Sequence, residues 1–209
     1  LQDGAVYSVA FNATDGITSA QTVTSTNVAF DSTAILPQIT SPTTGDRTNA
    51  ATVSYLLSEQ STTGWFVITR TGGVADSLSP YRYNLSGAQL AAGGRTWATG
   101  IQLVNNAVYD FELIGFTDRA GNTAPTVTAS NVTFDTTAVV ISNTTPTTKA
   151  IITSAQAGYT LSEQAASGTV TFTWTGGNPD PASPHVYTMQ ALDLTPGAHA
   201  GVLPFGLVR

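Results

Sequence analysis

Hydrophobic residues occupy alternate positions along much of the chain. Side chains two positions apart on a β-strand point to the same face, so this alternation predicts short strands with one buried face and with Thr, Ser and Asp outward. No segment carries the 3.6-residue stripe of an amphipathic helix. The sequence therefore predicts an all-β fold. The runs with this pattern are Tyr7, Val9 and Phe11; Val28 and Phe30; Val53, Tyr55 and Leu57; Phe66 and Ile68; Tyr109, Phe111 and Leu113; Val132 and Phe134; Ala157, Tyr159 and Leu161; and Val170, Phe172 and Trp174.

Short motifs recur at a constant distance along the chain. Leu57-Ser58-Glu59-Gln60 returns as Leu161-Ser162-Glu163-Gln164, and 161 minus 57 is 104. A fixed period of this kind indicates repeated structural units. The same distance separates Thr71-Gly72-Gly73 from Thr175-Gly176-Gly177, Ser79-Pro80 from Ser183-Pro184, and Asn27-Val28-Ala29-Phe30-Asp31 from Asn131-Val132-Thr133-Phe134-Asp135; Gly4-Ala5-Val6-Tyr7 matches Asn106-Ala107-Val108-Tyr109 at 102.

The repeat defines a modular organisation. About seven short strands in one repeat is the number found in an immunoglobulin-like β-sandwich. We expect residues 35–137 to form one complete module of this kind. Residues 1–34 would supply the C-terminal strands of a preceding module, and residues 138–209 the N-terminal strands of a following one.

One stretch of the predicted module has a family resemblance. Residues 107–109, then Asp118-Arg119-Ala120-Gly121-Asn122, then Phe134-Asp135-Thr136-Thr137 resemble the bacterial Ig-like repeats of large secreted adhesins and surface proteins. The resemblance implies a rod of tandem sandwiches, often stiffened by calcium, that holds a binding tip away from a cell. It also implies an extracellular or cell-surface location.

Charge and cysteine content exclude several classes of function. Thirteen acidic residues outnumber seven basic ones, and the formal net charge is −6. We therefore expect no nucleic-acid binding, which needs a basic surface, and no membrane insertion, because no run of 18 apolar residues occurs. The chain has no cysteine, which excludes disulfides and thiolate metal sites. Lack of cysteine suits a bacterial surface protein and a cytosolic protein equally.

Calcium is the ligand that the sequence suggests, although none is strictly required. Asp118 and Asn122 lie four residues apart in a predicted turn, and Asp135 ends the last strand of the module near the next junction. Glu59 or Glu163 would also face such a junction. Oxygen ligands of this kind suit a weak extracellular calcium site. Asp and Asn also close turns through backbone hydrogen bonds, so a purely structural role for Asp118 and Asn122 stays open.

Other residue types point to structure rather than catalysis. Tyr7 and Tyr109 each begin a strand after a turn, in the manner of the tyrosine corner of Ig domains. Trp65, Trp97 and Trp174 are candidates for glycan stacking or for packing, and Trp65 is expected outward because it alternates with Phe66. His185 and His199 accompany no catalytic motif. We expect no enzymatic activity.

The sequence is consistent with several functions. The leading one is a structural segment of an extracellular stalk, adhesin or fibre, with neighbouring Ig-like repeats as partners. The two partial modules would then be parts of a longer array, or would complete each other head to tail between copies of the chain, which builds a filament. The alternatives are a module that binds a glycan or a host surface protein, and an accessory spacer of a secreted hydrolase.

Overall fold

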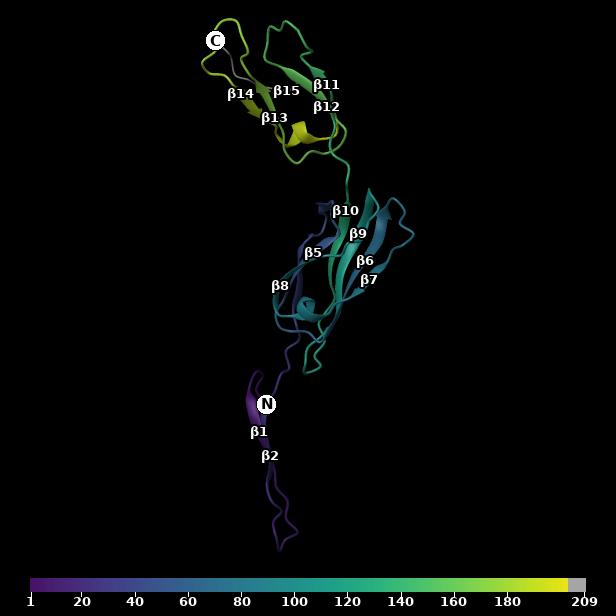
Figure 1. Ribbon diagram of the computed structural model, residues 1–209, viewed down its shortest axis with the longest axis vertical. Helices are drawn as coiled ribbons and strands as arrows, with labels where there is room; N and C mark the ends of the chain where they lie inside the picture. Colours follow the sequence, from purple (N-terminus) through teal and green to yellow (C-terminus); the bar gives the residue numbers. More distant parts are fainter. Residues whose placement is uncertain (203–209) are drawn as a thin grey trace. The chain divides into compact units, whose positions relative to one another are not determined.

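The computed structural model describes residues 1–202, and the end of the predicted third module, residues 203–209, lies outside this range. The chain is all-β, with two single-turn 3-10 helices among its strands (Figure 1). It divides into two compact units, Leu1–Thr136 and a second unit that begins at Thr137. The finer division at residues 34/35 stays a prediction. No helix in the described part of the chain is long and apolar enough to cross a membrane.

The first unit begins with an antiparallel pair of strands, which we call the N-terminal hairpin. Its register runs from Val6 opposite Ala29 to Phe11 opposite Val23. The predicted burial of its alternating apolar residues is wrong here: Val9 is 37% and Phe11 59% exposed. Among residues 1–202 no second sheet covers the pair, so neither face is removed from water. The strands are β1 (Val6–Phe11) and β2 (Val23–Ala29).

The rest of the first unit, which we call the central sandwich, contains two sheets. One has the strand order β4-β10-β9-β6-β7 and the other β3-β5-β8. Their facing sides share one core, in which the Phe66 ring of β6 lies 5.9 Å from the Trp97 ring of β8. This arrangement is consistent with a β-sandwich. Its elements are β3 (Pro37–Ser41), β4 (Arg47–Thr48), β5 (Thr52–Leu57), β6 (Thr63–Gly73), β7 (Tyr81–Asn84), η1 (Gly87–Leu90), β8 (Gly93–Ala98), β9 (Ala107–Thr117) and β10 (Val127–Phe134).

Alternation predicted the core of the central sandwich correctly. Val53, Phe66, Ile68 and Phe111 are 0% exposed, as the pattern requires. Trp65 is 39% exposed on the opposite face of β6, as expected. Strand β9 lies between β6 and β10 and contributes alternate buried side chains along eleven residues, so it is central to the core.

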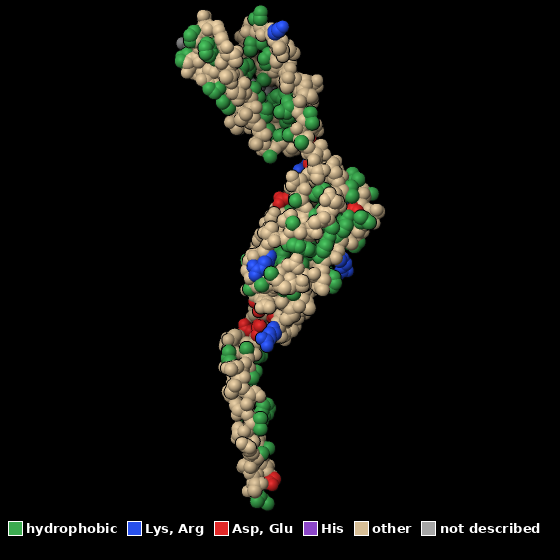
Figure 2. All heavy atoms as spheres, viewed as in Figure 1, with side chains coloured by type: hydrophobic (Ala, Val, Ile, Leu, Met, Phe, Trp, Pro, Cys, Tyr) green, Lys and Arg blue, Asp and Glu red, His purple; other side chains and the backbone are tan. Residues whose placement is uncertain are grey.

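The second unit repeats the first five long strands of the central sandwich at the same spacing. Its strand β11 starts at Ile141, 104 residues after Pro37, and β14 starts at His185, 104 residues after Tyr81. The sheets have the orders β11-β12-β15 and β13-β14. Figure 2 shows hydrophobic side chains at the surface of this unit. Its elements are β11 (Ile141–Thr145), β12 (Ala157–Leu161), β13 (Thr169–Phe172), β14 (His185–Thr188), η2 (Ala191–Leu194) and β15 (Gly197–Val202).

Candidate functional site

The loop after β9 is organised around one buried carboxylate. Asp118 is 3% exposed and lies one residue beyond the end of the strand. Its Oδ1 accepts hydrogen bonds from the backbone N–H groups of Gly121 (2.7 Å) and Asn122 (2.9 Å). The Asn122 side-chain amide donates to Oδ2 at 2.9 Å. The turn-closing role that the sequence left open for Asp118 and Asn122 is therefore confirmed.

Two further carboxylates reach the same place. Asp31 follows β2 of the N-terminal hairpin, and Glu59 follows β5 of the central sandwich. One carboxylate oxygen from each, together with one from Asp118, lie within 4.8 Å of one another. The Asn122 side chain also donates to the backbone oxygen of Asp31 at 3.3 Å. We call Asp31, Glu59 and Asp118 the carboxylate cluster, and acidic side chains gather in this part of the first unit in Figure 2.

The three carboxylates of the cluster repel one another, and this repulsion affects the pKa of Glu59. Burial raises the pKa of Glu59, and the charges of Asp31 and Asp118 raise it further. Burial also acts to raise the pKa of Asp118, but hydrogen bonds from Asn122 and Gly121 outweigh it, and the pKa lies below its usual range. The pKa of Glu59 is thus raised by burial and by its acidic neighbours while that of Asp118 is lowered, and a bound cation would offset the repulsion among the three carboxylates.

The residues present fit a hard divalent cation. Calcium takes oxygen ligands at about 2.3–2.6 Å, so oxygens that share one ion lie within about 5 Å of each other. The three carboxylates of the cluster meet that spacing. Asp118, Glu59 and Asp31 are thus the side chains that would hold the ion, and its charge would join the end of the hairpin to the loops of the sandwich.

Asp135, the third residue of the predicted calcium site, lies elsewhere. Strand β10 runs antiparallel to β9, with Thr133 opposite Val108 and Val127 opposite Leu113. Asp135 follows the end of β10, so it lies beside the start of β9, whereas Asp118 follows the end of β9. There Asp135 accepts an ion-pair hydrogen bond from Arg47 at 2.8 Å. The structure brings Asp118 and Asn122 together and leaves Asp135 at the opposite end of the sheet.

Asp31 is the member of the cluster that the sequence reasoning missed. It occupies in the preceding repeat the position that Asp135 occupies in the complete one, 104 residues later. The constant spacing of the sequence motifs contained the signal, because Asp31 follows β2 and lies beside the loops that follow β5 and β9. The expectation that Glu59 faces a junction agrees with its place in the cluster.

Several of the remaining candidate residues have packing or hydrogen-bonding roles in the described chain. Trp97 lies in the core against Phe66 and Tyr83. The guanidinium of Arg82 lies 5.7 Å above the Trp65 ring. His199 stacks on Tyr159 with ring centroids 5.0 Å apart. Comparison of the chain with protein-family models, with curated proteins and with solved structures gave no match.

Proposed function

We propose that this chain is a non-enzymatic structural segment of an extracellular stalk, adhesin or fibre, built from tandem immunoglobulin-like sandwiches of about 104 residues. The observation that carries the proposal is that β3, β5, β6, β7 and β8 of the central sandwich have counterparts in the second unit, β11 to β15, whose first residues lie 104 to 106 positions later. Similar modules stacked through neighbour contacts form an extended rod, whose work is reach and stiffness. Bacterial Ig-like repeats are the family that this organisation suggests.

A calcium ion at the carboxylate cluster would stiffen the rod. The cluster combines Asp31, which follows the hairpin of one repeat, with Glu59 and Asp118 of the next. An ion shared by both segments would restrict bending at residues 32–36, the link between them. At a concentration 100 times its dissociation constant, it would add about 2.7 kcal/mol to the stability of the folded state.

Thermal unfolding with EDTA and with excess calcium tests this proposal. Wild-type chain should melt at a higher temperature in calcium, and Asp31→Asn should remove most of that increment. Asp135→Asn is the matched control, because it changes the corresponding aspartate of the next repeat, outside the cluster. Its own melting temperature falls with the loss of the Arg47 ion pair, but its calcium increment should persist.

Two results would contradict the proposal. A melting temperature equal in EDTA and calcium removes the calcium site. Electron micrographs of the native material that show compact particles, instead of rods or filaments, remove the stalk function. Head-to-tail association of copies belongs to the same proposal.

A further inference from the structure

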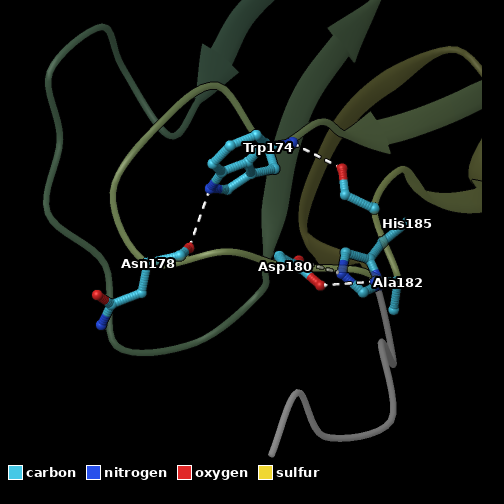
Figure 3. Close-up of polar contacts among 6 residues, drawn as sticks. Trp174, Asn178, Asp180, Ala182 and His185 are labelled. Carbon is cyan, nitrogen blue, oxygen red and sulfur yellow. Dashed lines mark hydrogen bonds and ion pairs between the residues drawn. The ribbon is translucent and has the colours of Figure 1, made fainter.

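Among the three tryptophans, Trp65 is the one whose indole the described chain leaves available. Trp97 packs in the core of the central sandwich against Phe66. Trp174 is 48% exposed, but its indole N–H donates to the backbone oxygen of Asn178 at 3.0 Å (Figure 3). Trp65 is 39% exposed, and its indole N–H makes no hydrogen bond to any residue within 1–202.

A β-bulge positions the Trp65 indole on the outer face of the five-stranded sheet. Trp65 pairs with Ile114, whereas Thr63, two residues earlier, pairs with Thr117, three residues later, so β9 contains one extra residue here. Gly115 lies in this bulge with φ +67, and a Cβ added to it would lie 3.4 Å from Cδ1 of Trp65. Glycine adopts this conformation without strain, and a bulge re-aims the side chains beside it.

Three polar side chains share the outer face with Trp65. Strand pairing places Asn84 of β7 opposite Trp65, and Arg82 of β7 opposite Val67, two positions along β6 (Figure 1). On the other side of β6, Glu112 of β9 lies opposite Val67. Residues two apart on a strand, and residues paired across strands, point to the same face of a sheet. We call Trp65, Arg82, Asn84 and Glu112 the outer platform.

Arg82 provides a cation that no described residue neutralises. Its guanidinium carbon lies 5.7 Å from the centroid of the Trp65 ring. Atoms in direct stacking contact lie about 3.5–4.0 Å apart, so the guanidinium does not seal the ring against a ligand. Arg47 forms an ion pair, and Arg70 and Arg95 donate to backbone oxygens. Arg82 makes no hydrogen bond and no ion pair within residues 1–202, so its N–H groups are available to a carboxylate.

The corresponding strand pair of the second unit has a different outer face. Strands β13 and β14 pair in the same register as β6 and β7. The indole, the guanidinium and the amide do not recur on this pair, although its inward face keeps a tyrosine. The outer platform is therefore not needed to form the strand pair, which favours a role in binding. The counterparts, each 104 residues later, are Thr169 for Trp65, Val186 for Arg82, Thr188 for Asn84 and, on the inward face, Tyr187 for Tyr83.

An exposed indole, a cation and hydrogen-bonding groups on one surface fit an acidic sugar. The apolar C–H face of a pyranose ring packs on an aromatic ring. Sugar hydroxyls exchange hydrogen bonds with an amide such as that of Asn84 and donate to a carboxylate such as that of Glu112. A carboxylate on the sugar forms a bidentate pair with a guanidinium, here that of Arg82.

The negative charge of the chain does not prevent this contact. Arg82 and Glu112 stand on the strands that flank β6, so two strand spacings, about 10 Å, separate them. Charges are screened over about 8 Å at physiological ionic strength. A carboxylate beside Arg82 is therefore attracted by the guanidinium more strongly than it is repelled by Glu112.

We propose that the outer platform binds an acidic glycan, through a uronic acid or another carboxylated sugar. The pyranose ring stacks on Trp65, Arg82 pairs with the carboxylate, and Asn84 and Glu112 bind hydroxyls. This activity goes beyond the stalk function, because it gives the central sandwich an attachment site of its own. None of the four residues belongs to the carboxylate cluster, so the binding does not depend on calcium there.

Calorimetric titration with matched sugars tests the site. The probes are oligogalacturonate, alginate oligosaccharide and sialyllactose, each compared with the same sugar after reduction of its carboxyl groups to alcohols. At least one acidic probe should bind the wild-type chain. Its reduced form should bind about 10-fold more weakly, because a charge-assisted hydrogen bond is lost. Added salt should weaken binding of the acidic probe only.

Variants that carry the residues of the second unit test the assignment of each side chain. Trp65→Thr should abolish measurable binding of both forms of the sugar, and Trp65→Tyr should restore part of it. Arg82→Val should weaken binding of the acidic probe about 10-fold and leave the reduced form unaffected. This loss of effect on the reduced sugar separates a direct contact with the carboxylate from a general change in the sheet.

Two substitutions outside the outer platform are matched controls. Trp174→Phe changes another partly exposed indole, and Arg119→Val removes an exposed positive charge from the loop after β9. Both should bind the acidic probe as wild type does. Thermal melting of each variant shows whether it is folded, and Arg82→Gln replaces Arg82→Val if the latter unfolds.

The proposal fails if no acidic probe binds, if the acidic and reduced forms bind equally, or if the control variants lose binding as the platform variants do. Equal affinity of wild type and Arg82→Val for the acidic probe also overturns it. A chain that binds no sugar but still gains stability from calcium would leave the stalk function standing, so the two failures are distinguishable.

Discussion

The second unit contains counterparts of β3, β5, β6, β7 and β8 of the central sandwich, and the two regions differ greatly in how many residues they bury. Eighteen buried residues form the core of the first, and four form the described core of the second. Strands β6 and β13 have similar alternating patterns, but only β6 has β9 beside it. The comparison shows that an alternating pattern of hydrophobic residues does not by itself bury a strand. The strand becomes buried only where other strands pack against it.

One part of the architecture persists in both units. The hydroxyl of Tyr55 donates to the backbone oxygen of Gln89 at 2.7 Å, and that of Tyr159 donates to the oxygen of Asp193 at 2.8 Å. Each bond ties the middle strand of a three-stranded sheet to a 3-10 turn 34 residues later. This part of each unit forms from nearby segments, whereas β6 of the central sandwich also pairs with β9, the first strand of the β9–β10 hairpin.

The largest expected difference between the regions comes from truncating β9. Phe111→Ala removes a fully buried ring that lies 5.8 Å from Phe66, and it should cost the central sandwich about 3–5 kcal/mol. Val9→Ala at the counterpart position, where the side chain is 37% exposed, should leave that stability unchanged. Urea unfolding followed by tryptophan fluorescence measures both, and equal losses of stability would contradict the comparison.

The second expected difference concerns the glycine that ends β6. Gly73 has φ +64, and a Cβ there would overlap the backbone oxygen of Asn106. Gly73→Ala should cost about 2–4 kcal/mol, because strain and overlap add. Gly177, its counterpart, has φ +83 with open space around it, so Gly177→Ala should cost about 1 kcal/mol. The urea concentrations at the unfolding midpoints of the two variants measure these costs, and equal costs would contradict a role for the strand beside Gly73.

A smaller effect should follow the loss of one hydroxyl. Tyr109→Phe removes the hydrogen bonds to Val104 and Asp76 from a fully buried side chain, and should cost about 1–3 kcal/mol of stability in urea unfolding.

The neighbouring phenol of Tyr81 should make stability depend on alkaline pH. Burial and the hydrogen bond to Asp76 raise the pKa of Tyr81 to about 12. The stability that this phenol contributes is present below pH 10 and lost as pH rises towards 12. Tyr81→Phe should flatten that alkaline loss in urea unfolding, and an unchanged slope would contradict it.

The smallest expected effect is a gain in stability. The folded state raises the pKa of Glu59, so its contribution is most favourable at acidic pH and is lost as pH rises through the raised value. Glu59→Gln should therefore raise the melting temperature at neutral pH in EDTA by roughly 2 °C. The same variant should lose its response to calcium. Glu112→Gln, on the outward face of β9, serves as control, and a fall in melting temperature for Glu59→Gln would argue against repulsion in the cluster.

The carboxylate cluster was predictable only in part. The spacing of Asp118 and Asn122 placed both in one turn, because a hydrogen-bonded turn is a local structure. The prediction that Asp135 joins them was wrong. The strand end that meets the turn is set by the direction of β10 relative to β9, which is antiparallel. Asp31 belongs to the cluster because it lies at the end of the hairpin. Its contact with Asp118 joins residues 87 positions apart, which the local pattern of the sequence does not reveal.

The sequence by itself determined the strands, their spacing and the face that each could bury, because alternation and turn residues act within a few positions. It therefore predicted the buried face of β6 and the matching pattern on β13. Tertiary structure alone decided that Phe66 is covered while Val170 and Phe11 are left partly in water. The physical reason is that burial of a strand face needs a second sheet packed against it, and the strands of that sheet come from distant parts of the chain.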